Sequence, residues 1–118
     1  MVNVGVLVSG SGTNLQSIID AIESGRLSAS IKLVISNKPD AYALERAEKH
    51  GIRTAVVRVK DFPSRELFDS EVLRLLKEAG VELVVLAGFM RLISSVLLEG
   101  FPMRIINIHP SLLPSFPG

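Results

Sequence analysis

Short apolar runs alternate along this sequence with stretches in which apolar residues recur every three or four positions. Runs of Val, Ile and Leu that end at Gly, Ser or Pro are typical of buried strands, whereas the wider spacing is typical of amphipathic helices. The predicted strands are residues 2–8, 31–35, 54–59, 83–86 and 105–108. The predicted helices run from Thr13 or Asn14 to Gly25, from 42 to 50, from Pro63-Ser64 to Gly80, and from 94 to 98.

Two of these helices have clear end signals. In the first, Thr13 or Asn14 supplies a polar side chain that can cap the start, and Gly25 can end the helix. The third opens at Ser64 and stops at Gly80. Its expected buried stripe consists of Leu67, Phe68, Val72, Leu75, Leu76 and Ala79. Each helix therefore has one apolar face that must be buried against another layer of the fold.

Strands and helices alternate through the whole sequence with short connections, which is typical of a parallel sheet covered by helices on both faces. We therefore expect an α/β fold with a Rossmann-like, doubly wound, mainly parallel sheet, in one domain over residues 1–118. In the common strand order 3-2-1-4-5, the connections reverse direction between strands one and four, and ligands bind at the carboxyl ends there. Three segments would then meet in one crevice, namely 9–14, 87–93 and 107–118.

Composition excludes several kinds of chemistry. The net charge of +1 favours neither nucleic acid nor membrane as a partner. Cysteine is absent, which excludes disulfides, thiolate metal sites and cysteine nucleophiles. We expect no metal site, because neither His50 nor His109 has an acidic or histidine neighbour at ligand spacing. No apolar run approaches the ~20 residues that cross a bilayer, and no signal-peptide pattern is visible, so we expect a cytoplasmic protein.

The glycine-rich segment "SGSGTN" (9–14) follows the first predicted strand and opens a helix. A dinucleotide site is not expected, because Leu15 stands where a third glycine is needed and "VISNK" ends the second strand without an acidic residue. The segment also lacks the Gly-Lys-Ser/Thr ending of a nucleotide-binding P-loop. Backbone N–H groups at a helix start suit one phosphate monoester. The alternative is a tight turn capped by Thr13 that binds no ligand.

Asn107 and His109 stand at the end of the fifth predicted strand. Side chains two positions apart on a strand lie on the same face, so the two are expected to point into the same space. An amide can donate to a developing oxyanion and an imidazole can transfer a proton, so the pair suits attack on a carbonyl carbon. The alternative is that His109 merely begins a solvated loop.

The segment "NIHPSLLPSFPG" (107–118) resembles the signature of folate-dependent formyltransferases. The segments "VLVSGSGTNLQSIIDAI", "VISNKPDAYALERAEKHGI" and "VVLAGFMRLIS" resemble one branch of that family, the glycinamide ribonucleotide (GAR) formyltransferases, and the similarity runs from Val4 to Gly118. Methionyl-tRNA formyltransferases share the proline-rich signature but lack this glycine loop. Formyltetrahydrofolate hydrolases also share the proline-rich signature, and they normally carry an extra domain before this fold.

The resemblance implies a role for each of several residues. Those that match the loop holding the GAR phosphate are Gly12, Thr13 and Asn14. Those that match the folate site are Arg65, Met90, Arg91, Leu92 and Ile93. Asn107 matches the amide that binds the formyl oxygen, and His109 matches the proton-transferring histidine. Without the resemblance, Arg65 would be interpreted as an exposed first-turn helix residue, and Met90 and Leu92 as core packing.

The resemblance further implies transfer of a formyl group from 10-formyltetrahydrofolate, as co-substrate, to the amine of GAR in purine synthesis. Two alternatives are hydrolysis of formyltetrahydrofolate and a non-catalytic fragment that binds folate or phosphate. The family pattern continues beyond Gly118 and includes a later aspartate that pairs with the histidine matched by His109. We therefore expect the domain to be truncated. A form that ends at Gly118 is expected to show little formyl transfer. Ile105, Ile106 and Ile108 would then lie at an unprotected sheet edge, through which a homodimer can form.

Overall fold

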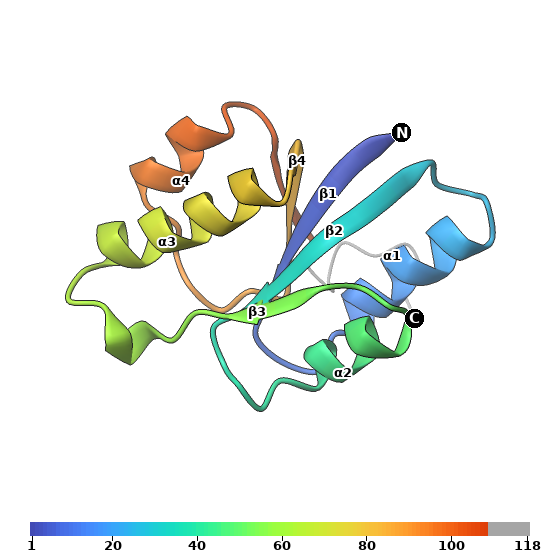
Figure 1. Cartoon of the computed structure of the whole chain (residues 1–118), viewed down its shortest axis with the longest axis horizontal. Coiled ribbons are helices and arrows are strands. Elements are labelled where there is room, and N and C mark those ends of the chain that lie inside the picture. The colour runs from blue at the N-terminus through green and yellow to red at the C-terminus, as the bar shows by residue number, and fades with distance from the viewer. Residues whose placement is uncertain (109–118) are drawn as a thin grey trace, which may run out of the picture.

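The computed structural model describes residues 1–108 of the chain, so the predictions that fall on residues 109–118, His109 included, lie outside the described residues. Strands and helices alternate as the sequence predicts (Figure 1). In chain order the elements are β1 (Val2–Val8), α1 (Thr13–Glu23), β2 (Ala29–Ser36), α2 (Tyr42–Lys49), β3 (Thr54–Val56), the 3₁₀ helix η1 (Val59–Asp61), α3 (Arg65–Glu78), β4 (Leu83–Ala87), α4 (Ser95–Gly100) and β5 (Ile105–Ile108).

The strands form one five-stranded sheet in the order β3-β2-β1-β4-β5. Every pairing between neighbours is parallel. The doubly wound α/β prediction and its strand order are therefore confirmed. The chain moves outward from β1 to β3, then crosses to β4 and moves outward the other way, so the direction reverses between β1 and β4 as expected.

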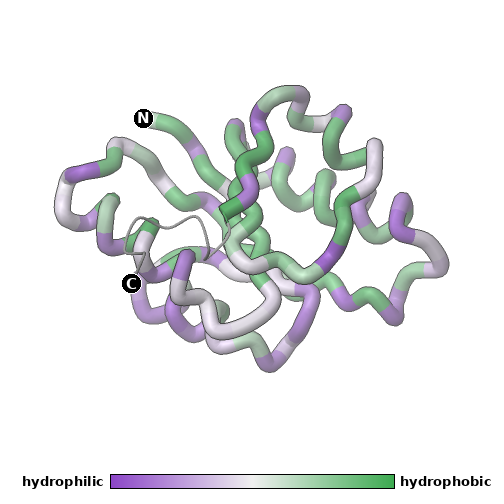
Figure 2. The backbone as a smooth tube through the Cα atoms, turned by 180° about the vertical axis from the view of Figure 1, so that it is seen from behind, coloured by the Kyte–Doolittle hydropathy of each residue, from purple (hydrophilic) through white to green (hydrophobic). Residues whose placement is uncertain are grey.

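The core lies in two layers, one on each face of the sheet. On one face, the strands pack against α1 and α2, with Leu15, Ile19 and Ala43 among the buried helix residues. On the other face, they pack against α3 and α4, whose buried residues include Phe68 and Leu97. Figure 1 shows the two helix pairs on opposite sides of the strands, and Figure 2 shows hydrophobic residues concentrated in the central strands.

The third strand and the buried stripe of α3 differ from their predictions. The third strand ends at Val56 and not at Val59, because its partner β2 ends at Ser36, which pairs with Val56. The chain then turns into η1. Leu67 does not belong to the buried stripe of α3 and is 51% exposed, because the buried face follows Phe68, Val72 and Leu76 at four-residue steps.

Strand β5 lies at an edge of the sheet, as predicted. Ile105 and Ile108 are half-buried on opposite faces, and Ile106 is 48% exposed. Beside this strand, on the face that carries α1, an apolar groove of about 260 Å³ is lined by residues that include Val4, Ile106 and Ile108. Within residues 1–108, this part of the sheet thus presents apolar surface next to a strand edge that has no further partner strand.

Among the helices of residues 1–108, none has both the length and the apolar character that a membrane crossing needs.

Candidate functional site

Two of the three predicted segments meet at the carboxyl edge of the sheet, where β1 and β4 end. A cavity of about 180 Å³ lies there, at the point where the winding direction reverses. Its lining consists of Gly10, Ser11, Gly12, Thr13 and Asn14 from the loop after β1, and Ala87, Gly88 and Met90 from the end of β4 and the loop after it. The convergence of segments 9–14 and 87–93 is therefore confirmed.

Only glycine fits position 12 of the loop between β1 and α1. Gly12 precedes α1 with a φ of 78°, a left-handed conformation that other residues adopt only with strain. A Cβ atom at this position would also lie 2.6 Å from the Cβ atom of Ala43 on α2. No side chain of the described residues caps α1 by a hydrogen bond, and Thr13 is the first residue of the helix, so the prediction that Thr13 or Asn14 caps it was wrong.

The carbonyl groups of Gly10, Ser11 and Gly12 in this loop each accept from a donor of the protein. The Gly10 carbonyl accepts from the Ala43 N–H at 3.0 Å, and the Gly12 carbonyl accepts from the Gln16 N–H at 2.8 Å. Between them, the Ser11 carbonyl accepts from Nε of Arg46 at 2.6 Å. Helix α2 thus holds two successive carbonyls of the loop on the side away from the cavity.

The N–H groups of the same loop are left as donors. Within residues 1–108, no carbonyl or side chain accepts from the N–H groups of residues 11–14. The N–H groups at the start of α1 also carry the positive end of the helix dipole. Asn14, which lines the cavity, is only 6% exposed and adds a buried amide. This arrangement suits an anion such as a phosphate monoester.

Ser9 connects the two segments that line the cavity. Its buried hydroxyl donates to the side-chain oxygen of Asn37, which follows β2, at 2.7 Å. The same hydroxyl oxygen accepts from the Met90 N–H, after β4, at 2.8 Å. One side chain at the end of β1 therefore fixes the positions of the chain after both neighbouring strands.

We predict that Ser9→Ala lowers the free energy of unfolding by about 1–3 kcal/mol, because it leaves the buried Asn37 amide oxygen and the Met90 N–H without their partner. Denaturant unfolding would measure this loss. Ser17→Ala is the matched control, since Ser17 is exposed and its hydroxyl donates to the Thr13 carbonyl, one turn earlier in its own helix. Equal stability of the two variants would contradict the role of Ser9.

The loop after β4 places its four predicted folate-site residues in different surroundings. Met90 and Leu92 are each 73% exposed, so the alternative of core packing was wrong for both. The guanidinium carbon of Arg91 lies 4.6 Å from the centre of the Phe68 ring on α3. Ile93 packs against the core on the α3 face. The loop ends at Ser94, whose N–H donates to the buried Asp69 carboxylate at 2.6 Å.

The remaining predicted residues lie on neighbouring elements. Arg65 is the exposed first residue of α3, three positions before Phe68, which Arg91 contacts. Asn107 is exposed on β5, paired in register with Leu86 of β4. By strand alternation, its side chain lies on the face of Ile105, where α3 and α4 pack. The prediction that the side chains of Asn107 and His109 point into the same space involves His109, which lies outside the described residues.

The sequence analysis missed three side chains that hold this site together. Ser9 and Asn37 each follow a strand, and polar residues at the carboxyl ends of neighbouring parallel strands are a signal that would have found them. Arg46 has no such signal, because an arginine in the middle of a helix is ordinary in sequence. Its bond to Ser11 joins residues 35 positions apart.

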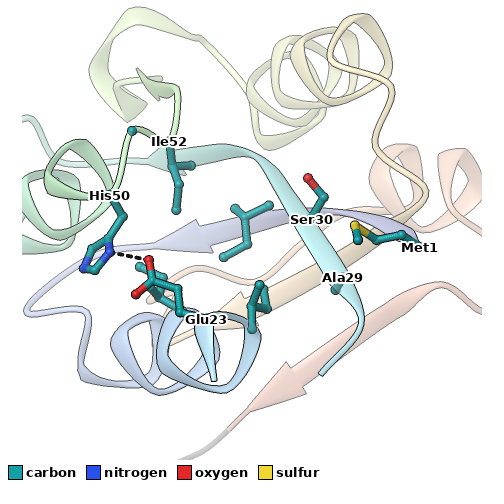
Figure 3. A pocket seen from close by; sticks show the side chains of 10 residues that line it. Met1, Glu23, Ala29, Ser30, His50 and Ile52 are labelled. Atoms are coloured by element: carbon teal, nitrogen blue, oxygen red, sulfur yellow. Dashed lines mark hydrogen bonds and ion pairs between the residues drawn. The ribbon is translucent and has the colours of Figure 1, made fainter. Parts of the chain in front are cut away.

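A larger cavity, of about 390 Å³, lies at the opposite edge of the sheet (Figure 3). Its lining comes from Met1, from the amino end of β2, from residues 50–52 between α2 and β3, and from Ile19, Ile22 and Glu23 of α1. The Nδ1 atom of His50 lies there at hydrogen-bond distance, 2.6 Å, from the Glu23 carboxylate. In the chain as far as Ile108, no group of three or more His, Cys, Asp and Glu side chains is placed to hold a metal ion.

These features define the class of protein: a doubly wound α/β protein with a cavity at the reversal point of its sheet, lined by a glycine loop whose N–H groups have no acceptor within residues 1–108. Residues 2–118 match the family model described as Formyl transferase. The chain belongs to the formyl transferase family, as the resemblance had indicated.

Similar proteins agree with this assignment. The phosphoribosylglycinamide formyltransferase of Escherichia coli (strain K12) is 45% identical over 116 residues, which are 98% of this chain and 55% of the relative. The trifunctional purine biosynthetic protein adenosine-3 of Drosophila pseudoobscura is 55% identical over 117 residues, which are 98% of this chain and 9% of that protein. The chain thus spans about half of the single-function relative.

Among solved structures, glycinamide ribonucleotide transformylase 1 from Symbiobacterium toebii superposes with a TM-score of 0.91 at 50% identity, over 100% of this chain and 56% of that one. The similarity therefore covers the fold as well as the sequence.

Proposed function

We propose that the chain functions as part of a phosphoribosylglycinamide formyltransferase, which transfers the formyl group of 10-formyltetrahydrofolate to the amine of GAR. The observation that carries this proposal is the loop at residues 11–14, which lines a cavity and whose N–H groups have no acceptor within residues 1–108, in a chain 45% identical to the Escherichia coli enzyme. The loop would bind the phosphate of GAR through Gly12, Thr13 and Asn14. Met90, Arg91, Leu92, Ile93 and Arg65 would form one wall of the folate site.

In the proposed reaction, the amine nitrogen of GAR attacks the formyl carbon and forms a tetrahedral oxyanion. The Asn107 amide donates to this oxyanion, and protonated His109 stabilises it. The bond between the formyl carbon and the folate nitrogen then breaks. The attacking amine loses one proton and the departing folate nitrogen gains one, with His109 transferring the proton. No covalent enzyme intermediate and no metal ion takes part.

Two assays test this proposal. Titration of the chain with GAR, followed by amide NMR, should shift the Gly12, Thr13 and Asn14 signals first. Formyl transfer should be measured with the chain alone and with the chain fused to the part of the Escherichia coli relative that lies beyond the match. The fusion is expected to form formyl-GAR.

The products distinguish the outcomes. Formation of formyl-GAR supports the proposal, and release of formate without GAR would favour a formyltetrahydrofolate hydrolase instead. A folded fusion that binds both ligands without turnover would favour a non-catalytic binding protein. The proposed place in purine synthesis implies a cytoplasmic protein that needs neither nucleic acid nor membrane as a partner.

We further propose that the chain forms a homodimer through the edge strand β5, where Ile106 is exposed. Light scattering should then give a dimer mass at high concentration, and Ile106→Lys should give a monomer, because a charge at a strand edge opposes pairing. Leu98→Lys, which replaces a similarly exposed residue on α4, is the matched control. A wild-type chain that stays monomeric at all concentrations would refute the dimer.

A further inference from the structure

Arg46 is held by three contacts behind the loop at residues 11–14. Its Nε donates to the Ser11 carbonyl at 2.6 Å, and Nη1 donates to the Gln16 side-chain oxygen at 3.3 Å. Its guanidinium carbon lies 4.9 Å from the centre of the Tyr42 ring. An arginine with its planar group bonded on one side and stacked on an aromatic ring has little freedom to move.

The contact with Ser11 fixes the direction of the next N–H group. In a trans peptide the C=O bond of one residue and the N–H bond of the next point in opposite directions. Arg46 holds the Ser11 carbonyl toward α2. The Gly12 N–H therefore points away from α2. Residues 10–14 line the cavity, whereas Ala43 and Arg46 of α2 do not. The side of the loop that faces away from α2 is therefore the side of the cavity.

Arg46 also places a positive charge behind the loop. Within residues 1–108, no carboxylate lies at ion-pair distance from its guanidinium. A half-buried cation without an anionic partner raises the electrostatic potential of the loop in front of it. Both the geometry and the charge thus favour an anion on the far side of the loop.

We propose that Arg46 is a positioning residue for phosphate binding: by holding the Ser11 carbonyl it aims the Gly12 N–H into the cavity. This inference rests on the proposed function, which assigns the GAR phosphate to this loop. Arg46 touches the loop and not the phosphate. The phosphate is recognised by backbone N–H groups whose direction Arg46 sets from helix α2.

The test compares Arg46→Met, Arg46→Lys and the wild-type chain in titrations with GAR and with inorganic phosphate, followed by amide NMR. Arg46→Met should bind GAR roughly 10- to 100-fold more weakly, the factor that a hydrogen bond to a charged group typically contributes. Arg46→Lys keeps the positive charge but lacks the planar guanidinium group, so most of the loss of GAR affinity should remain. The matched control is Arg53→Met, which removes an exposed charge just before β3, and it should bind as the wild type does.

The readouts separate positioning from other roles. The Gly12 amide signal of ligand-free Arg46→Met should differ from that of the wild type, while denaturant unfolding should confirm that the variant is folded. Full recovery of affinity in Arg46→Lys would show that charge alone matters and would overturn the positioning role. Unchanged affinity in a folded Arg46→Met would also overturn it. A wild-type chain that binds neither ligand would instead refute the proposed function, together with the inference built on it.

Discussion

Replacing Asn107 with alanine is expected to slow formyl transfer roughly 10²- to 10³-fold, the usual loss when one donor to an oxyanion is removed. The effect should appear in kcat, because under the proposed mechanism the amide acts on charge that develops only during the reaction. Steady-state rates of the fused protein, with both substrates varied, would measure it. Asn107 is exposed on an edge strand, so the substitution should leave stability nearly unchanged.

The control for this prediction is Asn3→Ala. Asn3 is also an asparagine on a strand of the same sheet, but it lies at the amino end of β1, where its side chain donates to the Gly80 carbonyl. Its removal should not change kcat. If Asn107→Ala turned over as fast as Asn3→Ala, Asn107 would have no part in the chemistry.

Replacing Gly12 with alanine is expected to lower the free energy of unfolding by about 2–5 kcal/mol and to abolish phosphate binding. The left-handed φ of 78° contributes about 1–2 kcal/mol of strain for a residue with a side chain. The contact of 2.6 Å with Ala43 adds an overpacking cost of about 1–3 kcal/mol. The loop must move away from α2 to relieve this contact. That movement changes the direction of the N–H groups of the loop. Denaturant unfolding and a GAR titration would measure the two effects.

The variant Gly25→Ala separates the two causes of the expected instability, which are backbone strain and overpacking. Gly25 has a φ of 82°, close to that of Gly12, but open space surrounds its missing Cβ atom. It lies at the far end of α1 from the loop, so its substitution should show the backbone strain alone, about 1–2 kcal/mol, with normal GAR binding. If Gly12→Ala were no less stable than Gly25→Ala, the close packing of the loop on α2 would not matter.

The helices and strands were largely predictable because their signals are local. The bounds of β1 and β5 agree with the predicted strands, and the glycines expected to end α1 and α3 have positive φ values just beyond those helices. The spacing of apolar residues indicates which positions of a helix or strand are buried, because buried positions require apolar side chains. The prediction for β3 was too long, since the end of this edge strand depends on β2, its one partner among the strands of residues 1–108.

The candidate site was only partly predictable. The glycine loop and the segment after β4 could be brought together from the strand order alone, because the carboxyl ends of parallel strands meet at one edge. Their attachment to the fold could not be predicted. Ser9 bonds to Met90 across 81 positions and Arg46 bonds to Ser11 across 35, and neither pairing leaves a periodic pattern in the sequence.

The sequence by itself determined the α/β class, the order of the elements and the family, because these depend on local periodicity and on contiguous motifs. Only the tertiary structure decided which groups face the cavity. The carbonyls of Gly10 and Ser11 are turned toward α2 by Ala43 and Arg46, and the N–H groups of residues 11–14 are left without an acceptor within residues 1–108. The direction of a peptide group depends on the partners that the folded chain brings to it, and those partners are distant in sequence.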